Sequence, residues 1–179
     1  MPQPFTSIRT ALRRFRRNRR GSAAVEFALV APVFFALLFA IIETAIVFFA
    51  GQVLETVTQD SARMIMTGQA QNAAYTQAQF KNYVCGRITV LFDCVNGISV
   101  DVQSYGNQFA SVTIVPPIDS SGNCVPPNNY NPGGAGNIVV VRLFYQWPLF
   151  VTGLGYNIAN CKNHMRLLTA TAAFQNEPY

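Results

Sequence analysis

A long apolar run preceded by a dense cluster of arginines constrains the fold of this chain more than any other feature. Between Glu26 and Glu43 the run holds no charged or strongly polar side chain, and residues 22–43 would form about 30 Å of α-helix, enough to cross a bilayer. Pro32 lies inside the run and predicts a bend, which membrane-spanning helices tolerate. Glu43 is expected at the far interface, where it can reach water. The sequence therefore predicts one transmembrane helix.

A cleaved secretory signal is the main alternative for such a run. The apolar core of a secretory signal is only about 7–15 residues long and ends at a site with small side chains. This run is longer, and cleavage after Ala50 would put Phe48 where a small side chain is required. The run is therefore interpreted as a permanent anchor.

Charge is distributed unevenly along the chain. The sequence has 13 Lys and Arg residues against 8 Asp and Glu residues, and more than half of the basic residues, but no acidic residue, precede position 21. Because basic flanks of a membrane helix stay cytoplasmic, the leader 1–21 is expected in the cytoplasm and the part beyond the span on the other side. Half of all residues are hydrophobic and 12% are charged, which favours a membrane-associated protein.

The leader has an amphipathic pattern of its own. Phe5, Ile8, Leu12 and Phe15 fall on one face of a helix that is otherwise basic. Such a helix is expected to lie on an anionic lipid surface, and nucleic acid is the less favoured partner for an arm so close to the bilayer. The arginines expected at the membrane surface are Arg13, Arg14, Arg16, Arg17, Arg19 and Arg20.

The helix is predicted to continue beyond the membrane, over residues 22–67 in all. Gly68 follows it and is expected to act as a C-terminal cap. The sequence leaves open whether this outer half packs only on its own domain or also against neighbouring subunits. The apolar positions that recur at helical spacing in the outer half are Ile46, Ala50, Val53, Val57 and Met64.

The exported part, residues 72–179, is predicted to fold as a small α+β domain. A capping box formed by Thr76 and Gln79 opens a helix. The apolar face of that helix is predicted to comprise Phe80, Val84, Ile88 and Leu91.

Three segments of the exported domain have strand patterns. They are residues 98–103, 137–147 and 166–175, and residues 109–115 are expected to extend the first strand or to pair with it. Residues 119–136 are rich in Pro, Gly and Asn and are predicted to form a loop. The predicted fold class is therefore α+β, with a long N-terminal transmembrane helix that carries, and packs against, a small antiparallel β-sheet.

All four cysteines, Cys85, Cys94, Cys124 and Cys161, lie in the exported domain, and an even number fits disulfides in an oxidising compartment. A Cys124–Cys161 bridge would join the long loop to the connection between the last two strands. The remaining pair, Cys85 and Cys94, would lie about 13 Å apart in an unbroken helix, so either the helix breaks near Gly86, which we favour, or the pairing differs. No metal site is predicted, because no two cysteines have ligand spacing and His164 is the only histidine.

The start of the apolar run resembles a known processing signal. Gly21 followed by Glu26 at the fifth position, after a basic leader and before a spanning helix, resembles the signal of type IV pilins and pseudopilins. The string Arg-Arg-Gly-Ser-Ala-Ala-Val-Glu-Phe-Ala-Leu-Val-Ala-Pro is similar to the TadE-like family of the Tad (Flp) pilus assembly system, over about residues 21–63. Residues 131–142, Tyr145-Gln-Trp-Pro and the ending 173–179 also resemble TadE-type proteins.

The resemblance implies a pilin-like fold and a pseudopilin or minor pilin that takes part in pilus assembly and adhesion. It implies a single-pass protein of the bacterial inner membrane with a periplasmic domain, whose partners are other pilin-like subunits, the Tad machinery and a prepilin peptidase. Gly21 would be the last residue of the leader, Ser22 the new N-terminus and Glu26 the acid at mature position five. Phe27 stands where Flp-type signals often have Tyr, and an uncut TadE-like protein is the alternative.

Glu26 has two interpretations. Cleavage after Gly21 would leave an ammonium on Ser22 at a helix N-terminus, where the macrodipole disfavours positive charge, and Glu26 one turn away could neutralise it. Without cleavage, Glu26 would be an interfacial carboxylate that reaches towards water, with Arg19 or Arg20 as its nearest charged partners.

An enzyme is disfavoured, because the exported domain lacks paired carboxylates and any Ser/His or Cys/His arrangement. No cofactor is expected, and Asp93, Asp101 and Asp119 are expected to be solvated. The alternative function is a signal-anchored periplasmic binding or structural module that is not processed. The apolar connection 149–156 would then be its contact surface, although ordinary packing would also explain that connection.

Overall fold

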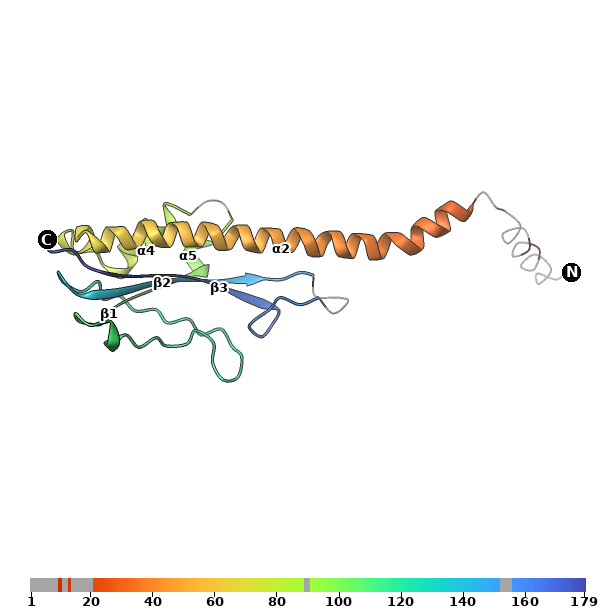
Figure 1. Cartoon of the computed structure of the whole chain (residues 1–179). Helices are drawn as coiled ribbons and strands as arrows, with labels where there is room; N and C mark the ends of the chain where they lie inside the picture. Colours follow the sequence, from red (N-terminus) through yellow and green to blue (C-terminus); the bar gives the residue numbers. More distant parts are fainter. Residues whose placement is uncertain (1–9, 11–12, 14–20, 89–90, 152–155) are drawn as a thin grey trace, which may run out of the picture. The chain divides into compact units, whose positions relative to one another are not determined.

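The computed structural model describes residues 10, 13, 21–88, 91–151 and 156–179 (Figure 1). It confirms the predicted α+β class, with one long N-terminal helix and a small antiparallel sheet. The chain divides into two compact units, Met1–Ile41 and Ile42–Tyr179. Its elements are α2 (Ser22–Met66), α3 (Gln69–Asn72), α4 (Gln77–Cys85), α5 (Cys94–Gly97), β1 (Ile98–Ser104), the 3-10 turn η2 (Phe109–Ser111), β2 (Ile138–Pro148) and β3 (Met165–Gln175).

The part of α2 that belongs to the first unit is apolar on all sides. From Val25 to Ile41 every large apolar side chain is exposed, with Phe27 at 68% and Leu29 at 73%. Pro32 lies inside the helix, and Figure 1 shows a bend in this orange-red part. By length and composition α2 could cross a membrane, and it is the one helix among the described residues that could.

In the second unit, one face of α2 is buried against the sheet. The buried positions Val47, Ala50, Leu54, Val57, Ser61 and Met64 alternate at spacings of three and four residues. This corrects the predicted face in part, because Ile46 is 40% exposed and Val53 is only half-buried. Up to Ala50 the helix is apolar on both sides, so its periodicity there could not specify which side the sheet covers.

The end of α2 follows the predicted capping pattern. Gly68 adopts a left-handed conformation with φ 74°, and its N–H donates to the carbonyl of Ile65 at 3.0 Å. A side chain at position 68 would also overlap the ring of Tyr179. Glycine is therefore required here by both backbone conformation and space.

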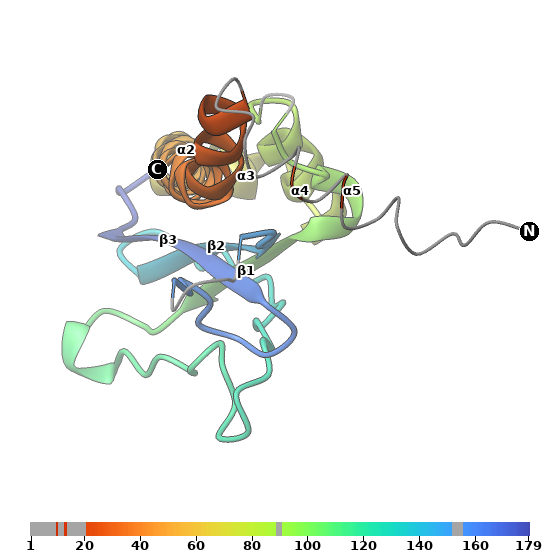
Figure 2. The same ribbon diagram turned by 90° about the vertical axis from the view of Figure 1, so that its right-hand side faces the viewer.

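The sheet is three-stranded and antiparallel, in the order β1-β2-β3. Val102 lies opposite Val141, and Val141 lies opposite Ala172. Figure 2 shows α2 and α4 on one side of the sheet and the long connection between β1 and β2 on the other. The core lies between the sheet and the helices, and the strand residues that contribute to it include Ile98, Val100, Val102, Val139, Val141, Leu143, Ala170 and Ala172.

Helix α4 begins as predicted but ends early. The Thr76 side chain accepts from the Gln79 N–H, the Gln79 side chain accepts from the Thr76 N–H, and Phe80 and Val84 are buried. The predicted extension to Ile88 and Leu91 is wrong. Ile88 lies beyond the helix but still packs on the core, whereas Leu91 is 37% exposed.

The two disulfides pair as the favoured prediction proposed. Cys85 bonds to Cys94 and Cys124 bonds to Cys161, each with a Cα–Cα distance of 5.6 Å. The helix break expected near Gly86 is present, because α4 ends at Cys85. The first bridge requires the chain to turn back within nine residues, which explains why α4 cannot continue.

The strand predicted at residues 109–115 is wrong. Phe109–Ser111 forms the turn η2, and no strand follows it before Pro116. The carbonyls of Thr113 and Val115 accept from the side chains of Tyr105 and Arg142, at 2.8 Å each. Side-chain donors from β2 and from the residue that follows β1 thus take the place of a strand ladder. The predicted loop 119–136 continues without a strand.

Candidate functional site

The predicted processing residues lie together at the start of α2. Ser22 is the first residue of the helix, and Glu26 follows four residues later, so the two share a helix face. Ser22, Glu26 and Phe27 are all exposed, and a Cβ added to Gly21 would meet nothing within 4 Å. Among the predicted membrane-surface arginines, Arg13 is exposed, whereas Arg14, Arg16, Arg17, Arg19 and Arg20 lie outside the described residues.

The apolar surface that follows has no preferred side. A helix that is apolar all round requires apolar surroundings on every side, either lipid or neighbouring helices. Within the first unit of the described chain, Glu26 is the one ionisable side chain of α2. An exposed carboxylate at the edge of such a surface can therefore pair with a cation from its own chain or from another.

The prediction that Glu43 reaches water is wrong. Glu43 is 8% exposed, and its Oε1 accepts from the backbone N–H of Phe150 at 2.6 Å. The N–H of Val151 donates to both carboxylate oxygens, at 3.2 Å each. The next side chain, Thr44, hydrogen-bonds to the hydroxyl of Tyr156. These contacts fasten the β2–β3 connection to α2.

The apolar connection 149–156 divides into a packed part and an exposed part. Leu149 is buried in the core, Val151 is half-buried, and Phe150 is 84% exposed. Packing therefore explains Leu149, whereas Phe150 is held by its backbone N–H and leaves its side chain exposed. Residues 152–155 lie outside the described residues.

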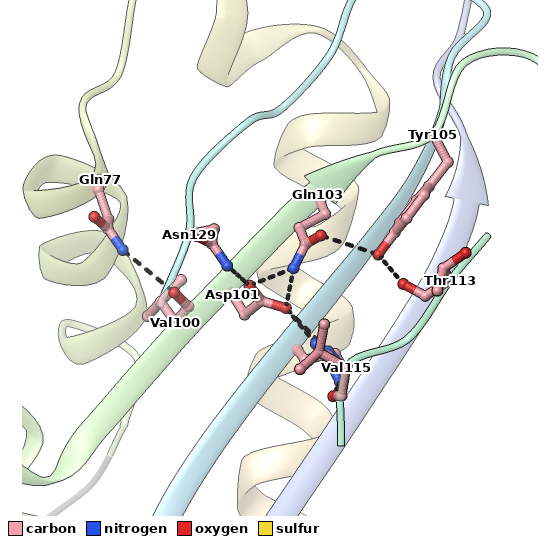
Figure 3. A network of polar contacts seen from close by, with 9 residues as sticks. Gln77, Val100, Asp101, Gln103, Tyr105, Thr113, Val115 and Asn129 are labelled. Atoms are coloured by element: carbon pink, nitrogen blue, oxygen red, sulfur yellow. Dashed lines mark hydrogen bonds and ion pairs between the residues drawn. The ribbon is translucent and has the colours of Figure 1, made fainter. Parts of the chain in front are cut away.

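The prediction that Asp101 is solvated is also wrong. Asp101 is 1% exposed and forms a buried ion pair with Arg142, whose Nε and Nη2 donate to Oδ2 at 3.0 and 2.7 Å. Gln103 and Asn129 donate to the same carboxylate, and Arg142 Nη1 donates to the carbonyl of Val115 (Figure 3). A buried charge pair persists only when such partners complete its hydrogen bonding.

This polar network holds the long connection against the sheet. Asn129 and Val115 belong to that connection, whereas Asp101 and Arg142 lie opposite each other on β1 and β2. Tyr105 joins the network through Gln103 and Thr113, and burial raises the pKa of its hydroxyl. The network is closed by its own partners, so it has a structural role and presents no reactive group.

The other two aspartates that were expected to be solvated, Asp93 and Asp119, lie at the surface. Asp93 is the N-cap of α5 and accepts from the N–H of Asn96. Asp119 is half-buried, and the hydrogen bonds from Asn123 lower the pKa of its carboxyl. Neither residue lies with other titratable groups in a cleft.

The described residues contain no group of three or more His, Cys, Asp or Glu side chains placed to hold a metal ion. An open groove of about 470 Å³ lies between α2 and β3, where Asp60 and Arg63 are its charged lining residues. Because the groove is open, it does not place a nucleophile or a general base in an enclosed site, as catalysis would require.

Comparison with known proteins locates the informative segment. The family model described as TadE-like protein matches residues 21–63. No curated protein and no solved structure matches the chain. Residues 21–63, which comprise the predicted processing residues and most of α2, therefore form a TadE-like segment, as the sequence resemblance predicted.

Proposed function

We propose that this chain is a pseudopilin or minor pilin that takes part in assembly of Tad (Flp) pili. In this proposal the first part of α2 anchors the chain in the bacterial inner membrane, and the sheet domain lies on the periplasmic side. One observation carries the proposal: a Gly21–Ser22 junction at the first residue of α2, whose exposed apolar part up to Ile41 has Glu26 as its one carboxylate, inside a TadE-like segment.

The chemistry at the junction is hydrolysis of the Gly21–Ser22 peptide bond by a prepilin peptidase. Water adds across the bond, so the leader leaves with a carboxylate on Gly21 and the mature chain begins with an ammonium on Ser22. The helix dipole destabilises that ammonium, and a carboxylate on the same face compensates it. Glu26 can do this for Ser22 of its own chain or of a neighbouring subunit.

The leader would set the orientation before it is removed. Its arginines favour the cytoplasmic side and anionic lipid, and its removal leaves the apolar helix free to pack among other pilin-like helices. The exposed apolar side chains of Val25 to Ile41 supply a contact surface on every side of the helix. Packing of such helices in lipid relies on close van der Waals contact rather than on a hydrophobic driving force.

Intact-mass measurement of the chain purified from native membranes tests the proposal. We expect the mass of residues 22–179. We also expect that Gly21→Leu blocks processing and leaves the full-length chain. Gly51→Leu is the matched control, because a Cβ added to either glycine meets nothing within 4 Å, and its processing should be normal.

A full-length chain in the unmodified protein would contradict the proposal and favour the unprocessed anchored module. Equal processing of the Gly21→Leu chain would show that this glycine is not recognised.

A further inference from the structure

The loop Leu149–Val151, here called the apolar loop, has all of its backbone donors paired. The N–H of Leu149 donates to the carbonyl of His164 at 3.0 Å, and the next two N–H groups donate to the Glu43 carboxylate. Its three side chains are apolar, and Phe150 projects into its surroundings. A loop in water can leave such donors to solvent, whereas backbone in lipid requires protein partners for them.

The exposed surface of α2 stays apolar for more than a turn beyond Glu43. Phe48 and Phe49 are 69% and 59% exposed, whereas Glu43 is buried and Thr44 is half-buried and bonded to Tyr156. The next exposed polar side chain along the helix is Gln52.

The extent of this surface can be compared with the thickness of a bilayer. Counted along α2, the stretch from Phe27 to Phe49 without an exposed polar side chain is about 34 Å long. The hydrocarbon layer of a bilayer is about 30 Å thick. The side-chain exposures therefore put the boundary of the lipid-facing surface near Phe49. This is more than one helical turn beyond Glu43, where the charge pattern of the sequence predicts the boundary.

We propose that the apolar loop enters the bilayer beside α2 and that Glu43 is the residue that permits this. The proposal rests on the membrane anchor of the proposed function. The carboxylate satisfies two N–H groups that lipid could not, and those N–H groups in turn stabilise a charge that lipid would penalise. Phe48 and Phe49 then lie where the hydrocarbon ends.

Lipid is favoured over a second protein as the occupant because of where the loop is fixed. Glu43 directly follows Ile42, the last residue of the uncharged run, and holds the backbone of Phe150 at that level of the helix. If α2 up to Phe49 is in lipid, the backbone of Phe150 lies within the same layer. The exposed side chains of the helix and of Phe150 then face the same surroundings.

A spin-label experiment on the full chain tests this proposal. All four cysteines form disulfides, so Phe150→Cys supplies a single free thiol for a nitroxide label. Leu37→Cys is the matched variant on the apolar helix, and Phe109→Cys is the matched exposed phenylalanine on the long connection. Each labelled chain is reconstituted in vesicles of phosphatidylcholine and phosphatidylglycerol, and collision rates with oxygen and with a water-soluble nickel chelate are measured.

We expect the ratio of oxygen to nickel collisions to be several-fold higher at position 150 than at position 109, and close to that at position 37. Equal ratios at 150 and 109 would overturn the proposal. Shielding of position 150 from both reagents, with spin–spin broadening that dilution with unlabelled chain relieves, would also overturn it, because a second copy would then cover the loop.

Position 37 separates this proposal from the anchor on which it depends. Water-like ratios at positions 37 and 150 together would remove the membrane anchor itself. A lipid-like ratio at position 37 with a water-like ratio at position 150 would leave the anchor intact and reject only the entry of the loop.

Discussion

The two parts of helix α2 both carry many apolar side chains, but the surroundings of these side chains differ. Up to Ile41 the large side chains are exposed on every side, whereas from Ile42 onward one face is buried against the sheet. The two glutamates differ in the same way: Glu26 is exposed, whereas Glu43 is buried and bonded to two backbone N–H groups. Apolar composition alone therefore does not tell which part of a long helix supports the folded domain.

A matched pair of leucines should give the largest difference between the two parts. Leu54 is fully buried and Leu37 is 58% exposed in the same helix. We expect Leu54→Ala to lower the free energy of unfolding of the sheet domain by about 3 kcal/mol, through lost burial and a residual cavity. Leu37→Ala should leave it unchanged within about 0.5 kcal/mol.

Trp147, the one tryptophan of the sequence, reports unfolding of the sheet domain by fluorescence in the detergent-solubilised full chain. Equal losses for the two leucine variants would mean that the two parts of α2 are not distinct in their contribution to folding.

The two glutamates should separate stability from assembly. Glu43→Ala leaves the N–H groups of Phe150 and Val151 without their acceptor, and we expect a loss of about 2 kcal/mol in the unfolding free energy of the sheet domain. Glu26→Ala removes no contact of that domain, so its stability should not change. Under the proposed function, however, Glu26→Ala should reduce piliation while membrane insertion stays normal.

Fluorescence unfolding and electron microscopy of piliated cells measure the two effects. Normal piliation of the Glu26→Ala strain would contradict the assembly role, and an unchanged midpoint for Glu43→Ala would contradict its role in fastening the loop.

The smallest effect concerns pH, and it should be confined to the second unit. Burial raises the pKa of Tyr130 to about 12, and among the described residues its hydroxyl has no hydrogen-bond partner. The unfolded chain loses this proton near pH 10 and the folded chain near pH 12, so the contribution to stability is present below pH 10 and is lost as the pH rises to about 12.

Tyr130→Phe should weaken this alkaline destabilisation and change stability at neutral pH by about 0.5 kcal/mol or less. Unfolding midpoints measured across this pH range test the prediction, and an identical pH profile for the variant would contradict it.

The elements that were predicted correctly are those whose causes are local. The capping box at Thr76, the glycine after α2 and the alternating strands each depend on residues within a few positions of one another. The strand expected at residues 109–115 failed, because side chains of Tyr105 and Arg142 bind its carbonyls instead of a neighbouring strand. Its apolar pattern gave no sign of those partners.

In the candidate site, too, local features were predicted correctly and long-range contacts were not. The TadE-like segment that contains Gly21, Ser22 and Glu26 was recognisable from the sequence, because such a motif depends on residues close together in the chain. Glu43 and Asp101 were both expected in water, and both are buried. The sequence signal for the burial of Asp101 was Arg142, which lies in another predicted strand. Charged residues rarely occupy a buried strand position without a partner.

Short-range patterns in the sequence were enough to predict the helix, the strands and the TadE-like start, because apolar periodicity, caps and motifs act over short distances along the chain. The packing of the sheet on the helix was needed to show which positions of α2 are buried besides Ala50, Val57 and Met64. It was also needed to show the partners of Glu43 and Asp101 and the apolar side chains that remain exposed. The partners of Glu43 lie more than a hundred residues away, and Arg142 lies 41 residues from Asp101. Such contacts depend on how the sheet packs on the helix, which no local pattern specifies.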